Sequence, residues 1–172
     1  MKRILLWSFL ILFGAANLQP VATQKRDYLT APEADKIRDA ETTDLRIKLF
    51  LEFAEDRLKK FDYELHRGHH DRRRAERLNA LLNAYVGCVD DAAELIDLGR
   101  EKQEEIRSGI QRMKTKATEF LAYLKSLLEK GPELESYRET LEDAILGTED
   151  ALAEARKAEE EYAPPPVRRR PS

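Results

Sequence analysis

Cysteine, tryptophan, glycine and proline are all scarce in this chain of 172 residues, which contains one Cys, one Trp, seven Gly and seven Pro. A single cysteine excludes a small disulfide-stabilised scaffold, and so little Gly and Pro excludes a collagen-like or low-complexity chain. Residues 33–131 contain no proline, so nothing in that stretch forbids long helices. Charged residues make up 37% of the chain, far above the usual quarter. This composition predicts one domain of long helices with solvated faces.

An export signal is expected over residues 1–22. A basic N-terminus precedes an apolar run over residues 4–13, and small residues follow as far as Ala16. This order is typical of a secretory signal peptide, and the run is too short to span a bilayer as a helix. We expect cleavage after Ala16, with Ala22 as the second choice; the alternatives are an uncleaved anchor or a buried helix. No later stretch is apolar enough to cross a membrane, so the sequence predicts an exported protein, periplasmic or extracellular.

Cleavage would leave a more acidic chain with one thiol. Loss of Lys2 and Arg3 takes the formal net charge from −3 to −5, and Trp7 is lost as well. Cys88 then has no partner for an intramolecular disulfide in a compartment where disulfides form. We interpret Cys88 as a small buried hydrophobe; the alternative is a disulfide between two copies of the chain.

A first short helix is expected after a polar lead-in over residues 23–29. Thr30 and Glu33 have the spacing of a capping box, in which each side chain binds the other residue's backbone amide. Pro32 suits the first helical turn, where its missing N–H costs nothing. This helix is predicted over residues 32–40.

A second helix is predicted over residues 43–67, with Thr42 or Thr43 as its N-cap. Gly68 follows its end, as glycine commonly does. Its apolar side chains recur at steps of three and four, the helical period. They are Ile47, Phe50, Leu51, Ala54, Leu58, Phe61 and Leu65.

The longest helical pattern covers residues 71–130. Its core positions alternate steps of four and three without a slip in phase, which is a heptad seam. The seam comprises Leu78, Leu82, Tyr85, Val89, Ala92, Ile96, Gly99, Gln103, Ile106, Ile110, Met113, Ala117, Phe120, Leu124 and Leu127.

Two geometries fit this seam. A turn near Gly99 would give two antiparallel helices in a compact four-helix bundle, whereas an unbroken helix would be about 85 Å long. Gly99 and Gln103 are the weak points of the seam. The constant phase, the absence of proline and the helix-forming residues 100–105 favour one continuous helix.

Gly131 and Pro132 form the clearest helix stop in the chain, and a last helix is predicted over residues 132–162. The short turn requires this helix to fold back on the preceding one. Residues 163–172 contain three consecutive prolines and then three arginines, which predicts a disordered tail with extended polyproline conformation. The predicted fold is therefore all-α, with antiparallel helical hairpins on one long central helix, and a compact up-down four-helix bundle as the alternative.

All three histidines of the chain lie close together, as His66, His69 and His70. Their spacing, with carboxylates nearby, makes them weak candidates for a transition-metal site. Neighbouring arginines would repel a dication and no zinc motif is complete, so we expect no metal and no cofactor. A polar turn between helices is the favoured interpretation.

Two arginine runs are candidate anion contacts. They are Arg72, Arg73 and Arg74 at the expected turn, and Arg168, Arg169 and Arg170 in the tail. Nucleic acid is a poor match, because the chain is acidic, exported and lacks aromatic residues among the basic ones. Anionic lipid or cell-wall polymers fit better, although three arginines would give only a weak tether.

No catalytic motif appears, and we expect no enzyme. Paired carboxylates such as Asp90 and Asp91 are adjacent on a helix, so they point about 100° apart and do not converge in a cleft. The sequence favours a structural or protein-interaction protein of the cell envelope or periplasm, with self-association through its broad apolar helix faces. The alternative is a small-ligand or metal carrier with a pocket near Phe50, Phe61 and Tyr85.

Overall fold

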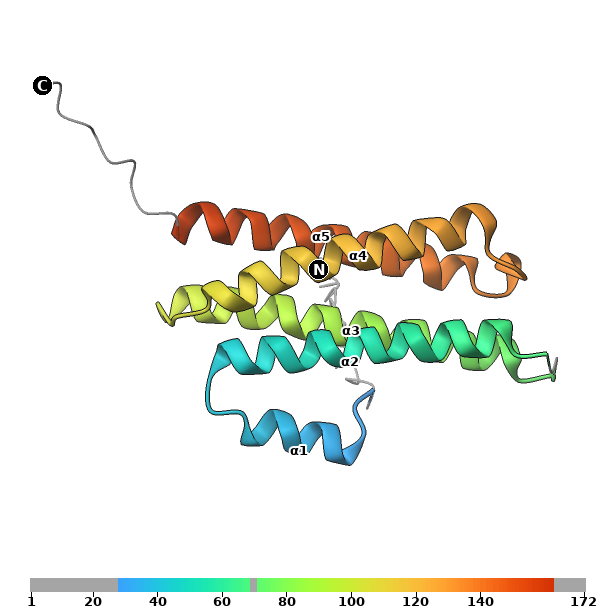
Figure 1. Ribbon diagram of the computed structural model, residues 1–172, viewed down its shortest axis with the longest axis horizontal. Coiled ribbons are helices and arrows are strands. Elements are labelled where there is room, and N and C mark those ends of the chain that lie inside the picture. The colour runs from blue at the N-terminus through green and yellow to red at the C-terminus, as the bar shows by residue number, and fades with distance from the viewer. Residues whose placement is uncertain (1–27, 69–70, 163–172) are drawn as a thin grey trace, which may run out of the picture.

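The computed structural model describes residues 28–68 and 71–162, and every regular element in these ranges is helical (Figure 1). The elements are α1 (Ala31–Asp39), α2 (Thr43–His66), α3 (Arg74–Glu101), α4 (Arg107–Lys130), the short 3-10 helix η1 (Leu134–Ser136) and α5 (Arg138–Tyr162). Within the described ranges, none of these helices has both the length and the apolar character needed to cross a membrane. The predicted all-α class is confirmed, whereas the predicted export signal lies outside the described residues.

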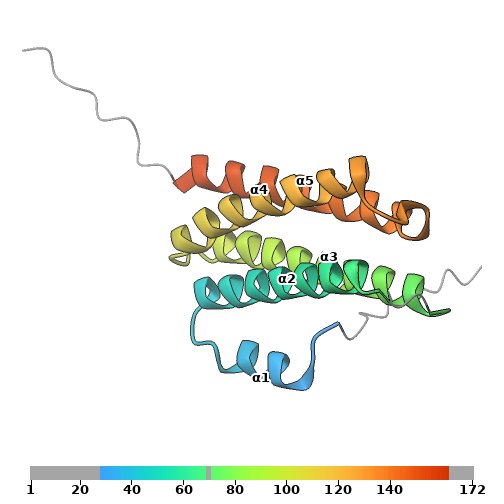
Figure 2. The same cartoon turned by 45° about the vertical axis from the view of Figure 1, so that its right-hand side comes forward.

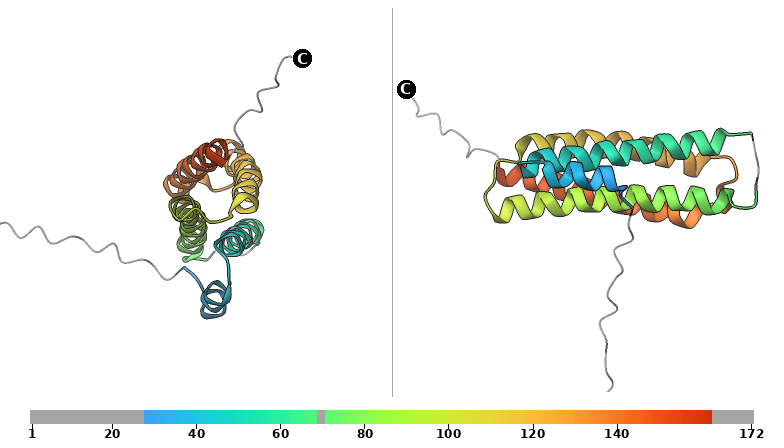
Figure 3. Two further views of the ribbon diagram at one scale, coloured as in Figure 1. Left: turned by 90° about the vertical axis from the view of Figure 1, so that its left-hand side faces the viewer. Right: turned by 90° about the horizontal axis from the view of Figure 1, so that it is seen from below.

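Helices α2 to α5 form a bundle of two antiparallel hairpins laid side by side (Figures 1 and 3). One hairpin is α2 with α3 and the other is α4 with α5. Helix α2 lies along α4, and α3 lies along α5, with both pairs running in the same direction. Tyr123 on α4 thus donates to Asp62 on α2 over 3.1 Å, and Tyr85 on α3 meets Thr148 on α5 at 2.7 Å. Helices α3 and α4 follow each other in the chain but lie across the bundle from one another.

The two hairpins match each other position by position at a constant separation of 63 residues. The turn glycines Gly68 and Gly131 are separated by this number, as are Tyr85 and Thr148. Matching core positions carry identical buried side chains: Ile47 and Ile110, Ala54 and Ala117, Leu58 and Leu121, Leu78 and Leu141, Ala92 and Ala155. The bundle is therefore built from two copies of one helical hairpin design, each burying its apolar face against the other.

The expected continuous helix over residues 71–130 is wrong, because α3 ends at Glu101 and α4 begins at Arg107. The backbone at Gln103 adopts a left-handed conformation, with φ of 56°. Its N–H donates to the Arg100 carbonyl over 3.0 Å, and the Glu104 N–H donates to the Gly99 carbonyl over 2.9 Å. These two bonds are a Schellman motif, which usually has glycine at the position that Gln103 occupies here.

The seam keeps its phase across this turn because the seam residues on either side of the turn, Gly99 and Ile106, are both buried in the core. Ile106 is fully buried, and its side chain lies so close to Gly99 that a Cβ there would approach it to 2.8 Å. Helix α4 has no N-cap side chain of its own; instead Asp44 on α2 accepts the Gly109 N–H. The helix start is thus supplied by a distant residue, which leaves no local signal in the sequence.

Gln103→Gly is expected to raise the free energy of unfolding by about 1 kcal/mol, because glycine adopts a left-handed backbone without strain. In an uninterrupted helix the same change would cost about 1 kcal/mol, so the sign of the effect distinguishes the two geometries. Urea unfolding measures it. Lys102→Gly is the matched control, since Lys102 has helical backbone angles and its replacement should not stabilise the chain.

The last helix also begins later than expected, at Arg138 rather than Pro132. Glu133 has a φ of 53°, which breaks the helical path, and the 3-10 turn η1 intervenes. Helix α3 begins at Arg74, three residues later than predicted, whereas α1 and α2 begin and end within one residue of the predicted bounds. Thr42 caps α2 by accepting the Leu45 N–H over 3.2 Å.

Helix α1 forms a strap that runs alongside the α2–α3 hairpin, outside the bundle, and none of its residues is buried (Figures 2 and 3). The predicted reach of Glu33 back to its N-cap is confirmed, because the Thr30 N–H donates to the Glu33 carboxylate over 2.8 Å. Few residues of α1 contact the bundle. Its apolar contact is limited to partly buried side chains such as Ile37, so polar contacts must also help to hold it in place.

A buried arginine supplies that attachment. Arg57 on α2 is 4% exposed and donates to both oxygens of Glu33, over 2.8 and 2.6 Å, and to the Tyr28 carbonyl over 3.1 Å. The Tyr28 ring lies directly on Gly87, where a Cβ would approach it to 2.7 Å, and its hydroxyl donates to Asp91. The charge-assisted Arg57–Glu33 pair and the packing of the Tyr28 ring on Gly87 thus attach residues 28–39 to the bundle.

The Glu33–Arg57 pair makes attachment of the strap dependent on pH. Hydrogen bonds from Arg57 lower the pKa of Glu33 from 4.5 to about 2. The contribution of Glu33 to stability is therefore complete above about pH 4.5 and is lost as the pH falls through 2. We expect the difference in unfolding free energy between wild type and Glu33→Gln to be constant above about pH 5 and to shrink on acidification. Urea titrations at several pH values measure it; a difference unchanged down to pH 2.5 would contradict the assignment.

Candidate functional groove

The third member of the arginine run at the α2–α3 turn, Arg74, has a structural role, because it is buried. Arg74 is 5% exposed. Its guanidinium donates to the carbonyls of Leu65 and Arg67, over 2.6 and 2.7 Å, and its Nε lies 3.1 Å from the Glu133 carboxylate. Arg74 therefore joins the end of α2 to the α4–α5 turn and does not face an external anion.

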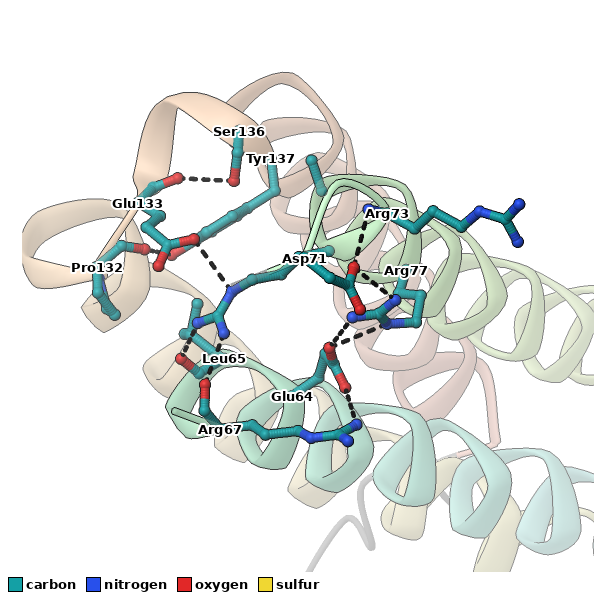
Figure 4. Close-up of polar contacts among 12 residues, drawn as sticks. Glu64, Leu65, Arg67, Asp71, Arg73, Arg77, Pro132, Glu133, Ser136 and Tyr137 are labelled. Atoms are coloured by element: carbon teal, nitrogen blue, oxygen red, sulfur yellow. Dashed lines mark hydrogen bonds and ion pairs between the residues drawn. The ribbon is translucent and has the colours of Figure 1, made fainter. Parts of the chain in front are cut away.

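A second polar network lies beside it at the start of α3 (Figure 4). Arg77 donates to Glu64 over 2.6 Å and to Asp71 over 3.0 Å. The bond from Arg77, together with one from the Arg73 backbone N–H, lowers the pKa of the Asp71 carboxyl. Arg72 and Arg73 are exposed, and they are the two members of this run that remain anion-contact candidates. The tail candidates Arg168, Arg169 and Arg170 lie outside the described residues.

Of the three histidines, only His66 lies in the described part of the chain. His66 ends α2 and its Nδ1 lies 2.9 Å from the Asp62 carbonyl, whereas His69 and His70 lie outside the described residues. Across residues 28–68 and 71–162, no three histidine, cysteine or carboxylate side chains are placed to share a metal ion.

Cys88 is buried, as the sequence predicted. Burial raises the pKa of its thiol to about 12, so very little thiolate forms at neutral pH. A disulfide between two copies would require the packing that covers Cys88 to open first.

The three side chains expected around a carrier pocket pack instead into the core. Phe61 and Tyr137 meet edge to face with ring centroids 5.2 Å apart, and Tyr85 meets Phe120 in the same way at 5.6 Å. Phe50 is 5% exposed. The hydroxyl of Tyr85 is satisfied by Thr148. The apolar faces that suggested self-association are likewise buried inside one chain.

A groove of about 330 Å³ lies between α2 and α4, which run in the same direction there. Its apolar floor is formed by Leu58 and Phe120, both almost fully buried. Tyr123 stands at one side, half-buried. The rim consists of Glu55, Lys59, Asp62 and Glu119. Another hollow, of about 430 Å³, lies beside α1, but the strap itself forms one of its walls.

Carboxylates outnumber lysines three to one along this groove. Lys116, just outside it, bridges the two helices by pairing with Glu55 over 3.1 Å and with Glu119 over 2.9 Å. Hydrogen bonds from Lys59 and from Lys116 lower the pKa of Glu55. At the other end of the groove, Asp62 accepts the Tyr123 hydroxyl. With Lys116 counted, three carboxylates face two lysines, so the groove combines an apolar floor with a rim that is acidic by one charge. Such a groove suits an apolar segment carrying positive charge.

Sequence reasoning missed this groove because it treated the charged positions as solvated faces. Phe120 was placed in the seam, but the seam alone does not show that α2 lies along α4. No family model, no curated protein and no solved structure matches the chain. The proposals below therefore depend on the geometry of the chain itself.

Proposed function

We propose that this chain is an exported protein-interaction protein of the cell envelope or periplasm, without catalytic activity, and that the α2–α4 groove is its binding surface. The observation that carries this proposal is the groove itself, with its apolar floor and acidic rim. A groove of this kind suits an apolar peptide segment with basic residues, because buried apolar contact gives affinity and the rim charges set orientation.

The packed interior supports binding at the surface rather than inside the bundle. Tyr85, Phe61 and Met113 are fully buried and fill the space between the hairpins. A small-ligand or metal carrier remains the alternative, and it would need this core to open.

Site-specific photo-crosslinking in cells that produce the chain tests the proposal. A benzoylphenylalanine at Lys59, on the groove rim, is expected to give a cross-linked product. Mass spectrometry of its peptides identifies the product, whether the occupant is another protein or another segment of the same chain. Leu146 is the matched control, because it is 59% exposed and lies on α5, away from the groove. Equal adducts at both positions, or none at Lys59, would contradict a binding surface at the groove.

Export is tested separately, with alkaline phosphatase fused after residue 162. This enzyme requires an oxidising compartment for its disulfides, so an active fusion is expected. An inactive fusion that regains activity when a known signal peptide is added would contradict export.

A further inference from the structure

We propose that the α2–α4 groove binds residues 163–172 of the same chain in an extended conformation, with the tail arginines against the carboxylate rim. This inference rests on the proposed function of the groove and names the chemistry of its occupant. The segment reads Ala-Pro-Pro-Pro-Val-Arg-Arg-Arg-Pro-Ser, which combines rigid apolar residues with three positive charges. Reach, shape and charge each support this assignment.

The tail is long enough to reach the groove. Glu159, in the last turn of α5, pairs with Lys114 on α4, so the chain leaves α5 beside the first part of α4. Phe120 and Tyr123 lie six and nine residues further along α4. The end of α5 lies about one helical turn beyond Glu159. From there to Phe120 and Tyr123, the tail must cover about 14–18 Å along the bundle axis and about 10 Å sideways across α4. Eight residues in polyproline conformation span about 25 Å. The arginines can therefore lie along the groove.

The shape of the segment matches the groove. Consecutive prolines favour an extended helix that is already ordered before binding, so little conformational entropy is lost. The prolines stiffen the part of the tail that crosses α4, and residues 167–171 reach the Phe120 floor and the Tyr123 side of the groove. The parallel course of α2 and α4 makes the groove a straight channel.

The rim carboxylates determine where the tail arginines bind and in which direction the tail runs. Glu119 is exposed on the α4 side, and Asp62 is exposed on the α2 side. An arginine binds a carboxylate with two parallel hydrogen bonds, which a lysine such as Lys116 cannot reproduce. The contact is expected to weaken at high salt, because the rim is exposed to solvent.

Paramagnetic relaxation in the full chain tests the proposal. A spin label is placed at Ser172→Cys in a Cys88→Ala background, and amide signals are recorded by NMR. We expect signals from residues 55–62 and 116–123 to lose most of their intensity, while those around Asp90 and Gly147, on the α3–α5 side, stay unchanged. Broadening confined to the neighbourhood of Tyr162, or spread evenly over the bundle, would overturn the proposal.

Charge reversal separates specific docking from general attraction. The triple variant Arg168→Glu, Arg169→Glu, Arg170→Glu should abolish the broadening, as should Asp62→Lys with Glu119→Lys. Combining both sets should restore it. Reversal of Glu101 and Glu105, which are exposed near the end of α5 but outside the groove, is the control and should leave the effect intact.

A mixed sample identifies the source of the tail. Isotope-labelled chain without a spin label is combined with spin-labelled chain without isotope; broadening in this mixture would show that a second copy supplies the tail, and would overturn docking within one chain. The test needs no partner protein. If the tail shows no contact while photo-crosslinking at Lys59 persists, this inference fails and the proposed function stands.

Discussion

Arg74→Ala is expected to destabilise the bundle by about 3–5 kcal/mol. The guanidinium is buried and satisfies two carbonyls at the end of α2, those of Leu65 and Arg67, as well as the Glu133 carboxylate. Removing it takes from all three acceptors their shared donor, and the loss is costly because the Leu65 carbonyl is buried. The midpoint of urea unfolding measures the loss, provided that the slope of the transition is unchanged.

The same arginine run supplies the control. Arg72 and Arg73 are adjacent to Arg74 but exposed, so alanine at either position should change stability by less than about 0.5 kcal/mol. Arg74→Lys should fall between the two, because a lysine keeps the charge but cannot reach both carbonyls with a planar fork. Equal effects for Arg74→Ala and Arg72→Ala would show that this guanidinium does not hold the two turns together.

Arg57→Ala is expected to release the strap while the bundle stays folded. Glu33 and the Tyr28 carbonyl lose their common donor, at a cost of about 3 kcal/mol to strap closure. The thiol of Cys88 reports this release, because Arg57 and Glu33 lie near enough to influence its pKa, while burial raises it to about 12. A loss of about 3 kcal/mol corresponds to roughly 100-fold faster thiol labelling if labelling follows opening.

Gly87→Ala gives a second test of the strap that leaves every charge in place. A Cβ at Gly87 would come within 2.7 Å of the Tyr28 ring, so the ring must move off its seat. Thiol labelling should again accelerate, whereas Gly147→Ala, which meets only Asp90 at 3.7 Å, should leave the rate unchanged. Labelling that follows global unfolding alone in all variants would contradict a separately released strap.

Local signals predicted the helices well, whereas the joins between them depended on distant residues. The capping partners Thr30 and Glu33 lie three positions apart, so the start of α1 was visible in the sequence. The start of α4 was not, because its cap is Asp44 on another helix. A heptad seam reports which side chains are buried, and Gly99 and Ile106 are buried on both sides of a turn.

The candidate site was less predictable than the fold for the same reason. The charges of Glu55 and Glu119 are typical of solvated helix faces when each helix is considered alone. They become a groove rim only because α2 lies along α4, and that neighbourhood follows from the stacking of two similar hairpins. The 63-residue match between the hairpins was present in the sequence and could have indicated this stacking.

The distance between spin labels at Glu76 and Glu129 tests the account most directly, since the α2–α4 groove exists only if the chain turns back at residues 102–106. Both side chains are exposed, and the Arg74–Glu133 contact places their helix ends at the same end of the bundle. Pulsed electron resonance should give a separation below about 30 Å, a few helix diameters. A separation near 80 Å, the length of an unbroken helix between these positions, would contradict the bundle and with it the groove.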